Sequence, residues 1–525
     1  MPRKIKPPKP PGTTVPPPPP PVGTSTVISI DPVTRLEGHL KIEVTVDLVN
    51  AQPQVVDARA VGTLFRGLET ILTNRSPQDA PDITQRICGV CPVSHGMAST
   101  MALDKAANVS VPANARIMRN LVLGANFVQS HILHFYHLAL LDFVEGPAMA
   151  PWQPSWNVDK RINATDTQTL VNHYVTALDM RRKAHEMGAL FGGRLPHPPA
   201  FVPGGFTTTP RPERITKFKA YVTELITFID TTYLPDVDLL ERYYGSASNY
   251  AYDYSKIGRG RGNLLAYGVF DLDSTGQQKL LKAGQVTNGS ATVQPVDVNA
   301  ITEQVTYSWY DNRTNNLAPA SGATTPQYPK TGAYSWLKAP RYQGGAYEAG
   351  PLARMWVNGD YQYGISVLDR HHARARETQK VAYALRQWVE QLVPSGPVYQ
   401  PYTTPTTATS MGLTEAPRGA LGHWLRIASG RIANYQVVTP TCWNASPRDG
   451  SGNRGPIEEA LIGTPVSDIT KPIEVLRVIH SFDPCLSCAV HVMRPAEGAT
   501  IFRLGHPDGG RQLAGPPRAM AHVHA

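Results

Sequence analysis

Cysteine is scarce in this chain, and features typical of several protein classes are missing. The 525 residues contain five cysteines, an odd number that does not complete a framework of disulfides. No run of about 18 apolar residues is present, so no membrane-spanning helix is expected. The net charge is +9, but lysine and arginine form no stripe with aromatic residues, so nucleic acid is not an expected partner. With 41% hydrophobic and 17% charged residues, we expect a folded soluble protein.

The N-terminal segment lacks the apolar stretch of a secretory signal peptide. Residues 1–26 contain eleven prolines and begin with a basic stretch, which favours a polyproline II-like arm outside the fold. We expect this arm to be disordered, either as a solvated tail or as a docking arm for a partner. The chain is therefore expected to be cytoplasmic, and any membrane association would be made through its partners.

Periodic apolar residues predict a mainly helical α+β fold. Alternation predicts strands at residues 27–30, 40–46 and 54–60. Helical spacing predicts long helices at residues 112–143, 168–191, 212–244 and 371–393. The segment 246–350 is rich in Gly, Tyr, Thr and Asn and is expected to be an irregular β-containing region. Long helices without alternating strands favour a bundle core of long helices with flanking small β regions.

Four of the five cysteines form two Cys-x-x-Cys pairs near opposite ends of the chain, Cys88 with Cys91 and Cys485 with Cys488. Each pair can aim two sulfurs at one point, and thiolates favour zinc, iron and nickel over calcium or magnesium. Because the pairs are so far apart in sequence, only the fold can bring them together. Spacing alone leaves three interpretations open: a structural zinc site, an iron–sulfur or other redox metal, and two separate thiol motifs.

The residues around both pairs resemble the signature motifs of nickel–iron hydrogenase large subunits. Residues 86–95 read Arg-x-Cys-Gly-x-Cys-x-x-x-His, and residues 483–491 read Asp-Pro-Cys-x-x-Cys-x-x-His. Further segments that look like the family, in the family's order, are 31–39, 65–69, 414–419 and 440–444. The resemblance covers about residues 27–491. It implies the catalytic subunit of an uptake enzyme, of the group 2 kind, that splits H2 heterolytically into protons and electrons.

The resemblance implies a nickel–iron centre on the four paired cysteines. Cys88 and Cys485 would be terminal nickel ligands, and Cys91 and Cys488 would bridge nickel to iron. The iron would also hold carbon monoxide and cyanide. Four thiolates would make nickel electron-rich, and an open position between the metals could take hydride.

A magnesium ion is a second cofactor that the resemblance implies. Its ligands would be Glu69, the side chain of His491 and the backbone carbonyl of Val437, and magnesium prefers oxygen ligands. In the family the precursor is cut after the equivalent histidine. Residues 27–491 would then be the catalytic domain, and residues 492–525 a cleaved C-terminal maturation extension; an ordinary disordered tail is the alternative.

Three residues match the family's catalytic positions. Glu37 resembles the glutamate that begins the proton path from a terminal cysteine, a relay for which a carboxylate is suited. Arg418 resembles the arginine held over the open position, and Asp483 resembles its acidic partner. From residue type alone, Glu37 is a surface carboxylate, Arg418 forms a salt bridge and Asp483 caps a helix or turn.

Several further residues match family positions around the metals. His95 would lie near a bridging sulfur, although from residue type alone it is a core histidine. Pro417 and Thr441 would pack around the iron ligands. Ser130 stands where many members carry an aspartate, so one charge near the arginine is missing in this chain.

Val90 and Leu138 match the pair that narrows the family's gas channel, where isoleucine and phenylalanine mark many H2 sensors. This match favours an uptake enzyme, and core packing is the alternative. An H2-sensing regulatory hydrogenase remains an alternative function. So does a zinc-stabilised binding protein. A non-catalytic relative in respiratory complex I lacks the four cysteines that are present here.

The fifth cysteine, Cys442, is expected to be a buried structural thiol. One cysteine cannot hold an iron–sulfur cluster, so no such cluster is expected in this chain. H2 oxidation releases two electrons, which implies an obligate iron–sulfur small subunit with a large interface. The resemblance also implies a maturation endopeptidase and nickel-insertion proteins as partners.

Overall fold

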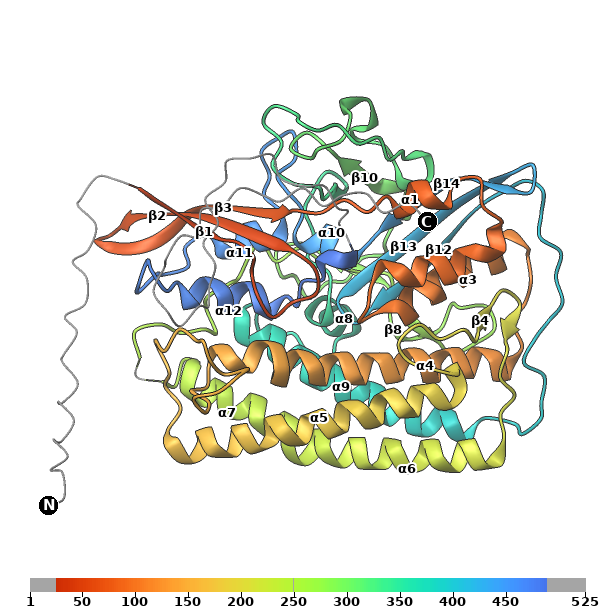
Figure 1. Ribbon diagram of the computed structural model, residues 1–525, viewed down its shortest axis with the longest axis horizontal. Helices are drawn as coiled ribbons and strands as arrows, with labels where there is room; N and C mark the ends of the chain where they lie inside the picture. Colours follow the sequence, from red (N-terminus) through yellow and green to blue (C-terminus); the bar gives the residue numbers. More distant parts are fainter. Residues whose placement is uncertain (1–24, 249, 489–525) are drawn as a thin grey trace, which may run out of the picture.

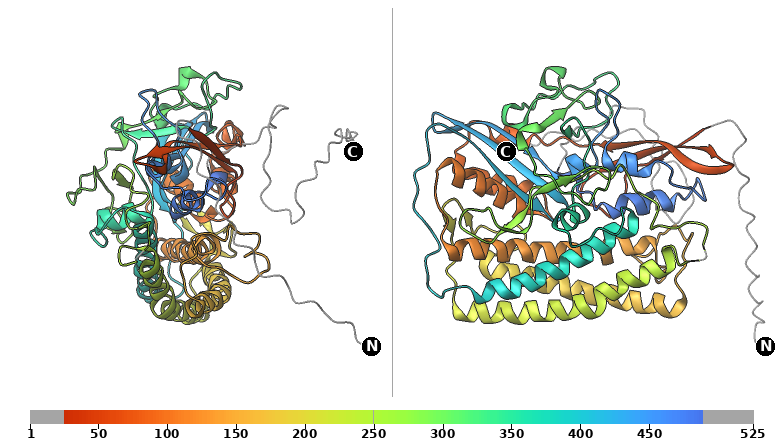
Figure 2. Two further views of the ribbon diagram at one scale, coloured as in Figure 1. Left: turned by 90° about the vertical axis from the view of Figure 1, so that its left-hand side faces the viewer. Right: turned by 180° about the vertical axis from the view of Figure 1, so that it is seen from behind.

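Long helices form one layer of the molecule, and the sheets and loops with the cysteine motifs form the other (Figure 1). The computed structural model describes residues 25–248 and 250–488. Helix α4 packs against α5 and α9, and α6 also packs against both of these helices, so the bundle is compact when seen from the side (Figure 2). The long helices are α4 (Ala113–Ile132), α5 (Ala164–Gly192), α6 (Pro212–Phe228), α7 (Leu234–Tyr244) and α9 (Val367–Glu390).

These helices confirm the four that helical spacing predicts, with two local changes. Beyond α4 the chain continues as the π-helix η3 (Leu133–Ala139) and a 3-10 turn, η4 (Leu140–Asp142). The predicted helix at 212–244 is α6 and α7, joined by the π-helix η5 (Ile229–Tyr233). Pro235 lies at the start of α7 and has no N–H to donate, so the hydrogen-bonding pattern has to shift there.

Helix α9 is buried although it carries many charged side chains. It packs against α4, α6, α7, α8 (Pro351–Asn358) and α12 (Ile473–Ser481). Its Arg370 pairs with Glu348 at 2.8 Å, and its Glu377 pairs with Arg354 at 2.7 Å. Such pairing is what makes buried charge tolerable. The helix therefore joins the bundle to the layer that carries the cysteines.

Two antiparallel three-stranded sheets lie in the second layer (Figure 1). The first contains the predicted strands, observed as β1 (Thr26–Ile30), β2 (Leu40–Val49) and β3 (Gln52–Gly62). The second consists of β12 (Ala408–Ala416), β13 (Gly419–Ala428) and β14 (Arg431–Val438), and no strand is predicted there. Most residues of β13 are buried, so the alternation by which a half-exposed strand is recognised is absent.

Short elements complete the described chain. The predicted irregular β-containing region at 246–350 has three two-stranded pieces, which pair β6 with β9, β7 with β8 and β10 with β11. Its strands are β6 (Leu264–Ala266), β7 (Val269–Asp271), β8 (Lys279–Leu281), β9 (Gly284–Val286), β10 (Ile301–Gln304) and β11 (Ala339–Tyr342). The others are α1 (Leu68–Leu72), α2 (Ala80–Thr84), α3 (Pro92–Ala106), β4 (Phe201–Val202), β5 (Gly205–Phe206), α10 (Pro440–Asn444) and α11 (Pro456–Leu461).

Several sequence predictions fall outside the described residues. These are the proline-rich arm up to residue 24, the extension at 492–525, His491 and the side chain of Cys488. Within the described ranges, no helix is long and apolar enough to cross a membrane.

The close packing of α4 on α9 depends on Gly124. A Cβ placed there would lie 2.6 Å from the buried Leu385 of α9. We predict that Gly124→Val destabilises the protein by about 1–3 kcal/mol, because overpacking forces the helices apart. The measurement is the thermal unfolding midpoint by calorimetry. Thr176→Val, which adds valine at an exposed site on α5, is the control and should shift the midpoint much less; equal shifts would contradict the prediction.

Candidate metal centre

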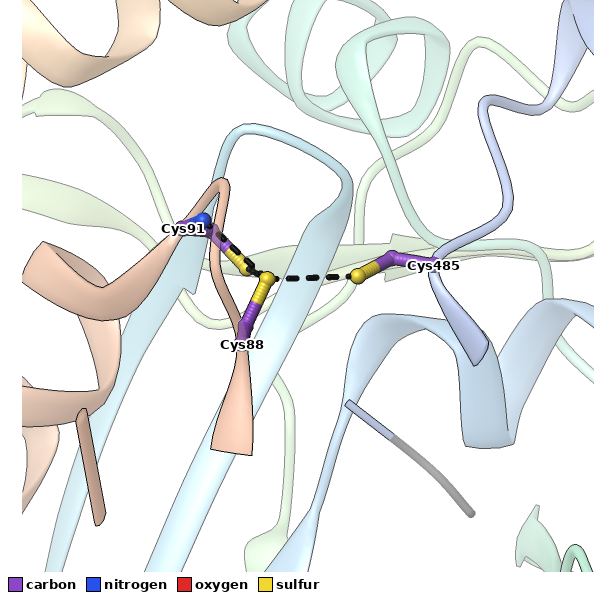
Figure 3. Close-up of side chains that lie close together, drawn as sticks. All are labelled: Cys88, Cys91 and Cys485. Carbon is purple, nitrogen blue, oxygen red and sulfur yellow. Dashed lines mark hydrogen bonds between the residues drawn. The ribbon is translucent and has the colours of Figure 1, made fainter. Parts of the chain in front are cut away.

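Three cysteine sulfurs meet where the N-terminal and C-terminal motifs come together (Figure 3). The Cys88 sulfur lies 3.0 Å from that of Cys91 and 3.3 Å from that of Cys485. The three sulfurs lie within 4.8 Å of one another, and all three residues are buried. The fold therefore brings the two predicted pairs together, with the side chain of Cys488 outside the described residues.

Backbone N–H groups of the N-terminal cysteine loop point toward the Cys88 sulfur. Backbone N–H groups of Val90 and Cys91 donate to the Cys88 sulfur at 3.3 and 3.1 Å. Cys91 is the N-cap residue of helix α3, and the positive end of a helix dipole attracts negative charge. This loop therefore presents two sulfurs at one point.

The C-terminal loop is fixed by its backbone. Asp483 has a φ of 55°, a left-handed conformation that aspartate tolerates better than most residues. The N–H of Cys485 donates to the hydroxyl of Thr441 on α10 at 2.9 Å. Thr441, which was predicted to pack around the iron ligands, therefore holds Cys485 by the backbone N–H of that cysteine.

The predicted proton acceptor, Glu37, lies directly against the C-terminal loop. Its carbonyl accepts from the N–H groups of Leu486 at 2.6 Å and of Ser487 at 3.4 Å. Its Oε1 lies 3.4 Å from the position that a Cβ on Gly89 would occupy. The carboxylate is therefore next to the N-terminal loop, and the backbone of the same residue supports the C-terminal one.

Arg66 links the two cysteine loops. Its guanidinium donates to the carbonyl of Ile87 at 2.8 Å and to that of Ser487 at 3.1 Å. It also donates to the carbonyl of Arg86. One side chain thus ties together loops that lie at opposite ends of the sequence.

Arg418 and Asp483 form a buried ion pair beside the sulfurs. Nη2 of Arg418 lies 3.0 Å from Oδ1 of Asp483, and both side chains are 2% exposed. Burial lowers the pKa of Arg418, but Asp483 and the three cysteine sulfurs outweigh burial and raise it well above its ordinary value. Nη1 of Arg418 lies 3.5 Å from the Ser130 hydroxyl, so the predicted neighbour is in place and offers a neutral oxygen.

The turn that presents Arg418 is held by another arginine, Arg354. All five of its N–H groups are used: for two glutamates and for the carbonyls of Ala416 and Pro417. Its side chain is 0% exposed. The planar guanidinium group offers five N–H donors in fixed directions, whereas a lysine ammonium would offer three. The Pro417 carbonyl accepts from Arg354 at 2.8 Å, and the packing of Pro417 around the iron ligands stays a prediction.

His95 lies behind the N-terminal cysteine loop. Its Nδ1 is 3.1 Å from Nε2 of His423, whose Nδ1 is 2.8 Å from the Tyr435 hydroxyl. Burial lowers the pKa of His95 to about 4, although Cys88 opposes this effect. The ring is therefore neutral at physiological pH.

Two of the three residues predicted to hold magnesium are in contact through a backbone N–H. The N–H of Val437 donates to Oε1 of Glu69 at 2.8 Å, and the hydroxyl of Thr324 donates to Oε2. The ammonium of Lys338 lies 3.8 Å from Oε2. The third ligand, His491, is outside the described residues.

The two predicted gas-channel residues, Val90 and Leu138, are both half-buried. The carbonyl of Val90 in the cysteine loop accepts from the Asn126 amide at 3.0 Å. Leu138 lies on η3, and its carbonyl accepts from Arg35 at 2.5 Å. Their action as a pair stays a prediction.

The residues present fit a thiolate-bound metal centre. Three converging sulfurs are soft donors that suit nickel and iron. Nε of Arg418 and Oδ2 of Asp483 are buried without a hydrogen-bond partner among the described residues. Buried polar atoms normally have a partner, so these two are available to a group bound at the sulfurs.

A family model described as nickel-dependent hydrogenase matches residues 66–169 and 147–491. The chain belongs to this family. A second model, described as HoxL-like, matches residues 27–60. The periplasmic [NiFeSe] hydrogenase large subunit of Desulfomicrobium baculatum is 44% identical, over 90% of this chain and 96% of that protein. The uptake hydrogenase large subunit of Rhizobium leguminosarum bv. viciae is 35% identical, over 91% and 97%.

Solved structures give the same family. The reduced Ni-Fe-Se hydrogenase from D. vulgaris Hildenborough has a TM-score of 0.84 and 42% sequence identity, covering 89% of this chain and 100% of that chain. These matches confirm the predicted fold and the predicted enzyme, a nickel–iron hydrogenase large subunit. The zinc-stabilised binding protein and the separate thiol motifs are thereby set aside.

Several residues that shape this hydrogenase site carried no recognisable signal in the sequence. Arg354, Glu377 and His423 act through contacts with residues distant in sequence. Their types and spacing are those of ordinary core or surface residues, so the three-dimensional fold was needed to find them. Arg66 lay inside a family-like segment, but nothing in that segment indicated that it joins both loops.

The close approach of the Glu37 loop to the C-terminal cysteine loop requires glycine at position 38. Gly38 has a φ of +86°, and a Cβ there would lie 2.3 Å from the Ser487 nitrogen. We predict that Gly38→Ala displaces the Cys485 loop and lowers the nickel content of purified protein several-fold, as elemental analysis would measure. Gly344→Ala is the control, because its φ is +76° but nothing lies within 4 Å. Equal nickel in both variants would refute the prediction.

Proposed function

We propose that this hydrogenase large subunit works in the direction of H2 uptake, on a nickel–iron centre held by Cys88, Cys91, Cys485 and Cys488. The observation that carries the proposal is the meeting of three buried sulfurs beside the Arg418–Asp483 pair. When bound, the centre supplies Lewis acidity toward H2 and accepts two electrons. Two relatives are named for selenium, and this chain has cysteine at all four positions.

In this proposal each pair would supply one terminal nickel ligand, Cys88 or Cys485, and one cysteine shared with iron, Cys91 or Cys488. The iron would also hold carbon monoxide and cyanide. The donated N–H groups at the Cys88 sulfur support a stable thiolate there. Arg418, with Nε lacking a described partner, would donate toward a cyanide or polarise H2, and Asp483 would keep its guanidinium in place.

Glu37 is proposed to take the proton from a terminal cysteine sulfur. Its carboxylate borders Gly89 in the N-terminal loop, and its backbone contacts Leu486 next to Cys485. A carboxylate held next to a metal-bound thiol can accept its proton and pass it outward. His95, Pro417, Thr441 and Ser130 are proposed to orient the ligands and the arginine.

Magnesium is proposed on Glu69, the carbonyl of Val437 and His491. The described contact between Glu69 and Val437 supports this, and an ionised carboxylate keeps acceptor capacity beyond its two hydrogen bonds. We also propose residues 27–491 as one catalytic domain, since the largest hydrophobic cluster has members from Ile30 to Leu486. Residues 492–525 would be removed by a maturation endopeptidase after nickel-insertion proteins have acted.

Large subunits of this family pair with a small subunit, which we propose to be an iron–sulfur protein that carries the electrons away. Val90 and Leu138 are proposed to line the gas channel. Localisation in the cytoplasm stays a prediction, because the Desulfomicrobium relative is periplasmic by name.

Infrared spectroscopy tests the proposed centre. We predict carbon monoxide and cyanide stretching bands from the purified, matured complex, together with nickel and iron by elemental analysis. Cys485→Ser should remove the nickel, whereas Cys442→Ser should leave the bands and the metals intact. The proposal fails if fully matured protein shows no such bands or contains zinc instead. A gas-uptake rate far below that of uptake hydrogenases would favour H2 sensing.

The proposed proton transfer is tested at Glu37. We predict that Glu37→Gln lowers H2-oxidation turnover about 100-fold or more, since general base catalysis contributes roughly 10²–10⁴-fold. Nickel content should stay unchanged. Glu43→Gln, at a half-buried surface position of β2, is the control and should keep turnover. Loss of nickel from Glu37→Gln would show that the residue is structural instead.

A further inference from the structure

The loop that carries Glu37 is tied to the helical layer by a cluster of charged side chains away from the sulfurs. Arg35 lies in this loop with a φ of 57°, a conformation that is unfavourable for a residue with a long side chain. Its Nη1 donates to the Leu138 carbonyl at 2.5 Å, and its Nη2 pairs with Asp142. These contacts hold the loop in a backbone shape that it would otherwise leave.

His480 holds the same loop from the end of α12. Its Nδ1 lies 2.6 Å from Oδ2 of Asp142, and its Nε2 lies 2.9 Å from the Thr34 carbonyl. Burial raises the pKa of Asp142, but Arg35 and His480 outweigh burial and hold it well below its ordinary value. The two ring nitrogens of His480 thus face two different segments, the Asp142 carboxylate on one side and the Thr34 carbonyl on the other.

The same cluster also contacts the segment that leads to Cys485, which packs against the backbone of Glu37. His480 comes shortly before the cysteine loop, and its carbonyl lies 2.6 Å from Nε2 of His134 on η3. The Asp142 side chain is 0% exposed, and that of His480 is 2% exposed. The Thr34–Gly38 segment and the segment that leads to Cys485 are thus both anchored to one buried carboxylate.

Space next to the cluster makes this anchoring necessary. A cavity of about 320 Å³ is lined by Thr34, Arg35, Asp142 and Lys160, among others. A loop that lost its hold on Asp142 would have room to move into this cavity. On the side that faces the cavity, packing does not hold Thr34 and Arg35, so their hydrogen bonds to His480, Asp142 and Leu138 limit movement there.

We propose that Asp142, together with Arg35 and His480, is a positioning group that sets the place of Glu37 beside the cysteine sulfurs. The inference rests on the proposed role of Glu37 in proton transfer. Asp142 does not touch the sulfurs; it acts through the backbone from Thr34 to Gly38. Its loss should therefore leave the metals bound and impair the exchange of protons at the site.

The experiment compares variants in the complex of large and small subunits. Asp142→Asn should lower the rate of D2/H⁺ exchange, in which D2 and a solvent proton give HD and D⁺, by about 10- to 100-fold, the scale expected for misplacement by about 1 Å. Mass spectrometry should show faster amide hydrogen exchange in segments 34–38 and 486–487. Nickel content should equal that of the unaltered protein.

A second pair of variants separates positioning from folding. His480→Phe keeps a ring but cannot donate to Thr34, and it should reproduce the loss. His480→Gln can donate to the Thr34 carbonyl and should recover part of the exchange rate. Asp236→Asn is the matched control, because Asp236 is also buried and lies 2.9 Å from a histidine, His173. It should leave D2/H⁺ exchange and the amides of segment 34–38 unchanged.

The outcomes distinguish this inference from the proposed function. If Glu37→Gln abolishes proton exchange while Asp142→Asn and His480→Phe do not change it, the positioning role is wrong and the role of Glu37 stands. If Glu37→Gln has no effect, the proposed proton acceptor fails first. Nickel loss in both Asp142→Asn and His480→Phe would overturn the inference and make the cluster part of metal retention.

Discussion

The metal site depends on one backbone contact, in which Glu37 and Gly38 lie against the chain from Cys485 to Ser487. Cys88 and Cys485 are 397 positions apart in the sequence, and neither loop can position the other by local structure. The Glu37 carbonyl receives the N–H of Leu486, and Gly38 allows an approach that any Cβ would block. Hydrogen bonds and close packing therefore both act at this contact.

Charged side chains without access to water fix the rest of the site. Removing one partner from a buried ion pair costs about 3–5 kcal/mol, although the intact pair adds little net stability. Arg354, Glu377 and Glu415 therefore contribute less to the free energy of unfolding than to the geometry of the turn before Arg418. Burial raises the pKa of Glu415 to about 7 despite the pairing with Arg354. The loss of water around this carboxylate therefore outweighs the attraction of its partner.

The sequence predicted what local periodicity and spacing encode. The four long helices followed from apolar residues at helical spacing, and the paired cysteines with their flanking residues indicated the metal site. Strands β12 to β14 were missed because most residues of β13 are buried, which leaves no alternation to detect. The polar residues of α9 gave no sign that the helix is buried, because their partners come from other segments.

The residues of the site also differ in whether local sequence indicates them. Thr441 and Pro417 were found because they lie in family-like segments, but the contact by which Thr441 holds Cys485 is visible only in three dimensions. Asp142 and His480 carry no local signal at all: one ends a helical stretch, the other lies three positions before Asp483, and only folding joins them to Thr34. A sequence motif can therefore indicate a metal ligand more easily than it can indicate the residues that position that ligand.

The fifth cysteine bears on where the electrons go. Cys442 is buried, its N–H and sulfur both contact the Thr439 hydroxyl, and burial raises its pKa to about 11. It is therefore a protonated thiol, a poor ligand for any metal. Among the described residues, the one group of side chains suited to a metal is that of Cys88, Cys91 and Cys485. The iron–sulfur small subunit proposed above would therefore hold the centres that receive the two electrons released at this site.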